Sequence, residues 1–264
     1  MPTDARTNRL LAQAISKLKS EGFEKHLCFW IKELLQYDNT SMIAYFQDKP
    51  PEALMLSSEE PKVHENFEKI YVNGAYLLDP FHELHTQKAA SGVYQLHAIA
   101  PDHFRRNRYF VEYYQNTTLI DEIGFIAYPS DGVSVHLCLG RDSHSKSKFS
   151  NREFSVSEMI APVVCSLIER HYNELSSTGK YDESWVVNNL RIQAQTRHQI
   201  SLSPRQAQVA MLILRGHSSI SIGLQLGISP QTVKVFRKQL YKKCEISSQA
   251  ELFSLMLPLL RHDI

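Results

Sequence analysis

The chain has 264 residues and a net charge of +1, from 29 Lys and Arg against 28 Asp and Glu, and 43% of its residues are hydrophobic. At roughly 150 residues per domain, this length suggests one large domain or two ordinary ones. The composition is that of a globular protein and excludes extensive disorder. No apolar run approaches the ~18 residues of a membrane helix, and the chain start lacks the apolar segment of a signal peptide. We therefore expect a cytoplasmic protein without a membrane partner.

Charge is unevenly distributed along the sequence. Residues 201–264 hold eight basic and three acidic side chains, a net charge of +5, whereas residues 1–200 carry −4. A compact basic segment behind an acidic one is expected when only one part of a protein meets phosphate groups. This asymmetry places a boundary just before Ser201.

The motifs of several large enzyme classes are missing. There is no GxxxxGK[ST], GxGxxG or GxSxG sequence. The segment His82-Glu83-Leu84-His85 does not have the HExxH spacing of a zinc protease, and we interpret it as part of a surface loop. Four well-separated cysteines form no CxxC pair and indicate reduced thiols: Cys28, Cys138, Cys165 and Cys244. We expect no metal, no cofactor and no enzymatic activity.

The first 175 residues predict helices around a small antiparallel sheet. Helical periodicity covers residues 7–36, with a break at Gly22, and helices are also expected over residues 62–77 and 101–114. Asp79-Pro80 is expected to end the helix over residues 62–77. Alternating apolar residues and turn signals predict strands at 40–46, 53–57, 123–128 and 133–139. This pattern is typical of a GAF- or PAS-like α/β sandwich, an antiparallel sheet flanked by helices.

A long helix closes this first part. Ser150 and Glu153 form a capping box, and Phe149 and Phe154 can form a hydrophobic staple around it, so we expect a helix over residues 150–172. Residues 176–200 follow as a linker with a connecting helix over 182–195. We therefore divide the chain into a regulatory domain (1–175), this linker, and a C-terminal domain (201–264).

The C-terminal domain contains a series of helix starts. Ser203-Pro204 and Ser229-Pro230 each place a capping serine before a proline at the first helical position. Further helix starts are expected near Ser219 and at Ser248. Gly216 and Gly227 separate the helices. Two short helices, a glycine turn and a basic following helix predict an all-α helix-turn-helix domain, so the whole chain is of the α+β class.

This segment also resembles the LuxR/GerE-type DNA-binding domain over about a quarter of the chain. The resemblance rests on Leu202-Ser203-Pro204-Arg205, on Gly216, on the run from Leu226 to Val235, and on Tyr241-Lys242-Lys243. The chain departs from the family at Gln206, at residues 219–223, at Phe236 and at Cys244-Glu245. The resemblance implies a bacterial-type transcription factor that binds promoter DNA.

A helix starting at Pro230 would present one basic face. Lys234 and Lys238 are four residues apart and share that face with Val235. Val233, Phe236 and Leu240 are expected to point the other way, toward the core. By resemblance we assign base contacts to Lys234, Val235 and Lys238. The candidates for phosphate contacts are Ser218, Thr232, Arg237 and Lys242. An ordinary solvated basic helix is the alternative.

The regulatory domain lacks the opening strand and clustered acids of a phosphorylated receiver, so we expect a sensor of a small molecule. Phe67-x-x-x-Tyr71 followed by Asp79-Pro80 is loosely similar to a segment of acyl-homoserine-lactone-binding LuxR domains, with Phe in place of Trp and a shorter spacing. Aromatic side chains with carboxylates suit a polar or cationic ligand. The candidate ligand residues are Tyr71, Tyr76, Asp79, Tyr109, Tyr113 and Asp121. Core tyrosines with a helix-capping Asp79 and a hairpin-flanking Asp121 are the alternative.

These patterns favour a ligand-controlled transcription factor that acts as a homodimer on double-stranded promoter DNA, with RNA polymerase as a further partner. Dimerisation is expected because a single module of this size reads only a short half-site. The first helices, the 150–172 helix, or a last helix with Leu252 and Leu255 could pair. The alternative is a regulatory domain that responds to a protein partner and has no small-molecule ligand.

Overall fold

The computed structural model describes residues 5–112, 114–177 and 183–260. Its contacts group the chain into two compact units. Unit 1 comprises Met1–His64, Lys88–Ile99 and Thr118–Lys180. Unit 2 comprises Glu65–Gln87, Ala100–Thr117 and Tyr181–Ile264. Segments from the first half of the chain are therefore grouped with the C-terminal helices.

Unit 1 is built on a five-stranded antiparallel sheet with the order β2-β1-β5-β4-β3. Its strands are β1 (Asn39–Phe46), β2 (Glu52–Ser58), β3 (Gly92–Gln95), β4 (Asp121–Ser130) and β5 (Val133–Arg141). The β1–β2 and β4–β5 hairpins confirm the predicted strands, whereas β3 carries no strong sequence signal and was not predicted.

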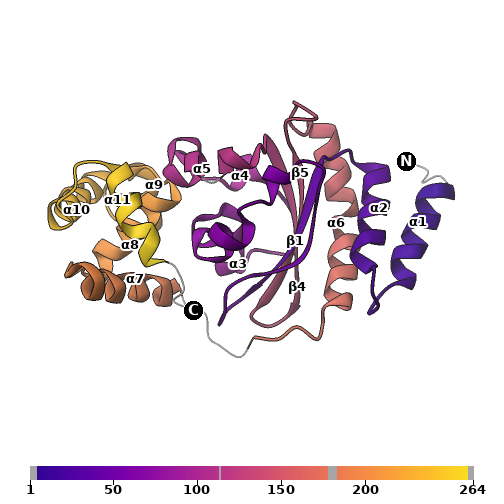
Figure 1. Ribbon diagram of the computed structural model, residues 1–264, viewed down its shortest axis with the longest axis horizontal. Helices are drawn as coiled ribbons and strands as arrows, with labels where there is room; N and C mark the ends of the chain where they lie inside the picture. Colours follow the sequence, from indigo (N-terminus) through magenta and orange to yellow (C-terminus); the bar gives the residue numbers. More distant parts are fainter. Residues whose placement is uncertain (1–4, 113, 178–182, 261–264) are drawn as a thin grey trace. The chain divides into compact units, whose positions relative to one another are not determined.

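Helices cover one face of this sheet (Figure 1). Helix α6 (Asn151–His171) packs against β3 and β4, α2 (Phe23–Leu34) contacts α6, and α1 (Ala5–Ser16) packs on α2. A short helix, α4 (Leu96–Ile99), follows β3. Gly22 has a φ of 86° directly before α2, which confirms the predicted break between the first two helices.

The core of unit 1 is apolar on the helix-covered face. It joins side chains of α2, α6 and alternate positions of β4 and β5, such as Leu27, Ile31, Phe125, Val135 and Val164. The intervening positions of β5 are buried as well: Ser134 and His136 are both fully buried and hydrogen-bonded to each other at 2.9 Å. The strand alternation was predicted, but burial of its polar face was not, because alternation does not reveal what covers each face.

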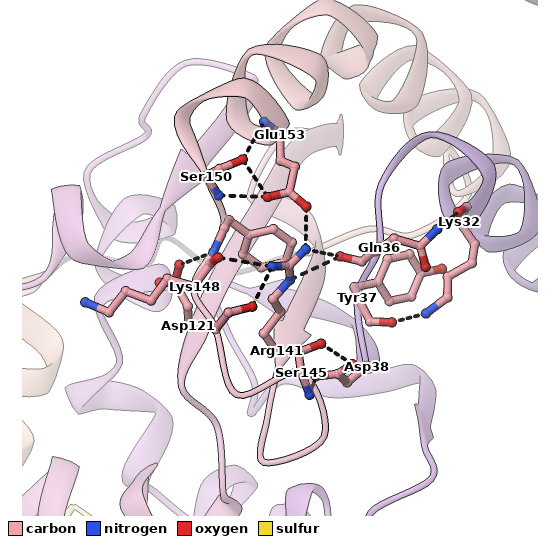
Figure 2. A network of polar contacts seen from close by, with 12 residues as sticks. Lys32, Gln36, Tyr37, Asp38, Asp121, Arg141, Ser145, Lys148, Ser150 and Glu153 are labelled. Atoms are coloured by element: carbon pink, nitrogen blue, oxygen red, sulfur yellow. Dashed lines mark hydrogen bonds and ion pairs between the residues drawn. The ribbon is translucent and has the colours of Figure 1, made fainter.

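A buried arginine fastens the beginning of α6 to the end of the sheet (Figure 2). The Arg141 guanidinium, at the end of β5, donates to the carbonyl oxygens of Gln36 at 3.1 Å and Lys148 at 3.0 Å, and pairs with the Glu153 carboxylate. Glu153 also accepts from the Ser150 amide, which completes the predicted capping box of α6. Breaking such a buried pair from one side costs about 3 kcal/mol or more, so this network stabilises the register between helix and sheet.

In unit 2, the segments predicted as continuous helices over 62–77 and 101–114 are broken into short turns. The first contains η2 (Phe67–Val72), η3 (Ala75–Leu78) and α3 (Pro80–Thr86), preceded in unit 1 by η1 (Pro61–Val63). The second contains η4 (Phe104–Arg106), α5 (Arg108–Glu112) and η5 (Tyr114–Thr117). Gly74, with a φ of 121°, interrupts the first segment in a conformation that residues with side chains rarely adopt.

Asp79-Pro80 begins a helix as well as ending a turn. The Asp79 carboxylate accepts from the Phe81 amide at 2.9 Å, and Pro80 occupies the first position of α3. As a result, His82, Glu83 and His85 lie on a helix and are buried. The prediction of a surface loop here was wrong, whereas the helix-capping role of Asp79, which the sequence left open as an alternative, is the one that the structure shows.

The remainder of unit 2 is helical. It contains α7 (Glu183–His198), α8 (Pro204–Arg215), α9 (Ser219–Leu226), α10 (Pro230–Lys243), α11 (Gln249–Met256) and η6 (Leu257–Leu259). Helix α8 lies at the centre, in contact with α7, α9, α10 and α11. These helices confirm the predicted all-α segment, and Leu252 of α11 is completely buried within it, so Leu252 is not available to pair with a second chain.

Candidate nucleic-acid interface and aromatic cluster

Serine side chains begin four successive helices of unit 2. The hydroxyl oxygens of Ser203, Ser218, Ser229 and Ser248 accept a hydrogen bond from the backbone amide three residues later, at 3.0–3.2 Å. Each cap satisfies an amide that the helix itself leaves without an acceptor and contributes about 1 kcal/mol. The caps therefore fix where α8, α9, α10 and α11 begin, and hence which side chains face outward.

Two departures from the LuxR/GerE pattern are accommodated by packing. The Gln206 side chain accepts from the Ser203 amide at 3.1 Å and from the Lys243 ammonium at 3.0 Å, which links the start of α8 to the end of α10. A Cβ atom at Gly223 would lie 2.7 Å from the Ile228 carbonyl oxygen. The glycine thus allows α9 and the start of α10 to approach closely.

Helix α10 has one buried and one open face. Val233 and Leu240 are fully buried, whereas Lys234 and Lys238 are exposed and Val235 is 47% exposed. The structure therefore brings the three predicted base-contacting residues onto one accessible surface. An α-helix of this kind fits the major groove, where Lys can donate to guanine and Val can touch a thymine methyl group.

The four predicted phosphate-contacting residues differ in how exposed they are and in the contacts they make. Thr232 and Lys242 are exposed on α10, and the half-buried Arg237 guanidinium lies 6.0 Å from the centre of the Tyr241 ring. Ser218 is largely buried at the start of α9, where its backbone amide donates to the Asp102 carboxylate at 2.8 Å. Three of the four side chains are thus at least partly accessible, whereas that of Ser218 is not.

A second cluster lies in residues 67–82 of unit 2. The Tyr71 hydroxyl donates to the Asp79 carboxylate at 2.6 Å, and the Tyr71 ring stacks on Phe67 with 5.0 Å between centroids. The Tyr76 ring lies 6.4 Å from Tyr71. Burial raises the pKa of Asp79 to about 6, although the hydrogen bonds from Tyr71 and the Phe81 amide favour its ionised form. Three of the predicted ligand residues, Tyr71, Tyr76 and Asp79, therefore lie together.

The other predicted ligand residues are placed differently. Tyr109 is buried, 6.1 Å from the Phe104 ring, in an aromatic group of residues 104–114. Asp121 belongs to unit 1, where its carboxylate accepts from the Phe149 amide at 3.0 Å and supports the start of α6. Tyr113 lies outside the described residues. The contact made by Asp121 corresponds to the structural alternative that the sequence left open.

One set of polar residues at this site could not be predicted from the sequence. Glu83, Asp102 and Asn107 contact the turn between α8 and α9. None of them stands in a recognisable motif, and their partners lie more than 100 residues away along the chain. Only the folded arrangement reveals that they belong with the helix-turn-helix.

The capped helices, the glycine-dependent packing and the exposed basic face of α10 define a helix-turn-helix DNA-binding module. Residues 200–256 match the GerE family, described as bacterial regulatory proteins of the luxR family. A relative from Aeromonas salmonicida, named as an HTH-type transcriptional regulator in the exeN 3′ region, is 32% identical over 184 residues, which cover 68% of this chain and 93% of the relative. The chain therefore belongs to the HTH-type transcriptional regulators, with a DNA-binding domain of the LuxR type.

Solved structures of two other proteins are similar to this chain. The LBD domain of VqsR from Pseudomonas aeruginosa is 21% identical, with a TM-score of 0.56, and the match covers 66% of this chain and 100% of that domain. This likeness shows a shared fold. A structure of Escherichia coli SdiA aligns over 98% of this chain and 99% of its own, with 14% identity and a TM-score of 0.43.

Two features are absent from the part of the chain that the structure describes. Within residues 5–112, 114–177 and 183–260, no helix combines the length and hydropathy needed to cross a membrane. In the same residues, His, Cys, Asp and Glu side chains form no group of three or more suited to a metal ion.

The raised pKa of Asp79 predicts a pH dependence of stability. The carboxyl has a pKa of about 6 in the folded protein and 3.8 ordinarily, so the folded state binds the proton more tightly. This contribution to the free energy of unfolding is complete below pH ~3.8 and is lost as pH rises through about 6, a change of roughly 3 kcal/mol. Asp79→Asn cannot ionise and should lack this component.

Urea unfolding at several pH values between about 4 and 7.5 checks this expectation. The unfolding free energy of the wild type relative to Asp79→Asn should fall as pH rises. The exposed Asp131→Asn substitution in the β4–β5 turn is the matched control. Parallel pH profiles for the wild type and Asp79→Asn would contradict a buried, raised-pKa carboxyl.

Proposed function

We propose that this regulator binds promoter DNA through α10 and that residues 1–175 control this binding in response to a small molecule. The observation that carries the DNA-binding part is the exposed Lys234–Val235–Lys238 face on a helix whose opposite side is buried. A solvated basic helix needs neither an exposed valine between its cations nor a capped turn that sets its angle. In a helix-turn-helix both features serve insertion into the major groove.

The surrounding polar groups position the helix on the DNA backbone. Thr232 and Lys242 flank the base-reading face, and Arg237 is held beside Tyr241. Contacts of this kind fix register and contribute most of the salt-dependent affinity, whereas Lys234, Val235 and Lys238 discriminate between bases. Ser218 can join them through its backbone amide at the start of α9 only when that amide is released from the Asp102 carboxylate.

The ligand part of the proposal rests on the Tyr71–Asp79 pair. A hydrogen-bonded phenol and carboxylate, set among Phe67 and Tyr76 rings, suit a polar or cationic small molecule. The VqsR match supports a sensor fold for the N-terminal part by its shape alone. The second candidate is a regulatory domain that responds to a protein partner and binds no small molecule. A ligand screen distinguishes the two candidates.

The proposed assembly is a homodimer that acts in the cytoplasm and contacts RNA polymerase at promoters. Two copies are needed because one helix-turn-helix reads only a short half-site. On α6, Met159 and Val163 are exposed at 59% and 39% and lie one helical turn apart. This apolar pair is a candidate for contact between two copies.

Replacing both recognition lysines should abolish sequence-specific binding. A duplex sequence enriched from a random library by the full-length wild type provides the probe. Lys234→Ala with Lys238→Ala should bind this duplex no better than the unselected library, because a good base contact contributes about 1–3 kcal/mol of discrimination. Gel shift or fluorescence anisotropy at fixed salt measures the difference.

The matched control removes two exposed lysines elsewhere, Lys62→Ala with Lys148→Ala, and should keep the preference for the enriched duplex. If the double variant in α10 still prefers the enriched sequence as the wild type does, the assignment of α10 as the recognition helix fails.

A thermal-shift screen of the full chain against metabolites and quorum signals tests the ligand part. A binding molecule at about 100 times its Kd stabilises the folded state by roughly 2.7 kcal/mol and raises Tm by several degrees. Tyr71→Phe should weaken this response, because it removes the hydroxyl that is bound to Asp79. The substitution Tyr94→Phe is the control, because the half-buried Tyr94 lies outside the cluster and its hydroxyl donates to the Ala90 carbonyl oxygen. Silence across a broad library would reject the small-molecule sensor and favour a protein partner.

A further inference from the structure

The turn between α8 and α9 is held by a segment far away in the sequence. The Gly216 carbonyl oxygen accepts from the His103 amide at 3.0 Å, and the Ser218 amide donates to the Asp102 carboxylate at 2.8 Å. The Asn107 side-chain amide donates to the Arg215 carbonyl oxygen at 2.9 Å. These bonds join both the main chain and the side chains of residues 102–107 to the C-terminal end of α8 and the first turn of α9.

The fit between the two segments is close. Gly216 has a φ of 100°, and a Cβ atom there would lie 2.7 Å from the Asn107 side-chain nitrogen. Asn107 is 1% exposed, and its side-chain oxygen also accepts from the Phe110 amide at 2.8 Å. The hydrogen bond from Phe110 thus holds the Asn107 side chain in place. The absence of a side chain at Gly216 leaves the space that the Asn107 side chain occupies.

A second acidic residue, Glu83 of α3, also contacts the turn between α8 and α9. The Glu83 carboxylate lies 4.0 Å from the Arg215 guanidinium and 3.8 Å from the His217 ring nitrogen. Arg215 also donates to the Leu77 carbonyl oxygen at 3.2 Å. Arg215 is 3% exposed, so one of the eight cations of the basic C-terminal segment is neutralised inside the protein and is withheld from DNA.

We propose that Asp102, Asn107 and Glu83 form an autoinhibitory clamp on the α8–α9 turn, in which the Asp102 carboxylate occupies the place at Ser218 that a DNA phosphate oxygen takes. This inference rests on the proposed binding of DNA by the helix-turn-helix. In that motif the helix before the recognition helix crosses the DNA backbone, so its first turn faces phosphate. An amide that donates to Asp102 cannot donate to DNA at the same time.

The clamp weakens DNA binding and leaves base recognition intact. Lys234, Val235 and Lys238 remain exposed while Ser218 is engaged. DNA must therefore displace Asp102 or bind with one backbone contact fewer, and a carboxylate near the phosphates adds repulsion. Any signal that moves residues 102–107 away from Gly216 raises the affinity. Leu77, between Tyr76 and Asp79, connects the proposed ligand cluster to Arg215 of this turn.

The test compares the full-length wild type with Asp102→Ala and Asp131→Ala. Both substitutions remove one exposed carboxylate, so they change the net charge equally, and only the first touches the clamp. Affinity for a random-sequence 30-bp duplex is measured by fluorescence anisotropy at fixed salt, and hydrogen exchange is followed at residues 216–221. Asp102→Ala should bind DNA ~3–10-fold more tightly than Asp131→Ala, with faster exchange at the α9 start.

Each result decides between the two claims. Equal DNA affinities for Asp102→Ala and Asp131→Ala would overturn the clamp and leave DNA binding by the protein standing. The clamp also fails if exchange at residues 216–221 is the same in the wild type and in Asp102→Ala. Absence of DNA binding by all three proteins, even at low salt, would overturn the proposed function itself, and the clamp with it.

Discussion

The backbone amides in the first turn of a helix have no acceptor within that helix, and in this protein the way they are satisfied sets the geometry of the DNA-binding module. Serine hydroxyls accept them at α8, α9, α10 and α11. At α9 the Ser218 hydroxyl accepts from the Ser221 amide, and the amide of Ser218 itself donates to the Asp102 carboxylate of a distant segment. The chemistry that shapes the module therefore also offers a way to control it.

The net charge of +1 is the sum of an acidic segment, residues 1–200, and a basic segment, residues 201–264. The structure shows where the charges of the basic segment lie. The cations of the C-terminal segment are not equivalent: Lys234 and Lys238 point outward on α10, whereas Lys243 donates to Gln206 and Arg215 is buried beside Glu83. Local placement, more than the total charge, determines which of these groups can reach phosphate or bases. Glu83 and Asp102 also place negative charge beside the α8–α9 turn, and the net charge of the segment does not show this.

Local signals made much of the fold predictable. The capping boxes at Ser150 and Ser203 and the β4–β5 hairpin depend on residues that are neighbours in sequence, and they formed as predicted. The helices expected over residues 62–77 and 101–114 did not form as continuous helices. Gly74 interrupts the first, and α5, in the second, contacts α8, which is far away along the chain. By contrast, helical spacing was enough to predict that Lys234, Val235 and Lys238 share one exposed face of α10. The contacts of Asp102 and Asn107 with α9 and α8 span more than 100 residues and have no local signature.

The central claim, that α10 enters the major groove, can be tested most directly by photo-crosslinking. A benzophenone amino acid placed at Val235 of the full-length protein should crosslink to bases of a bound duplex on irradiation, because this exposed side chain shares one face of α10 with Lys234 and Lys238, the proposed base-contacting lysines. The same group at Leu224, which is exposed on α9, is the comparison. Base crosslinks from position 235 that exceed those from 224 are the predicted result. Crosslinks from 224 alone, with none from 235, would contradict the account.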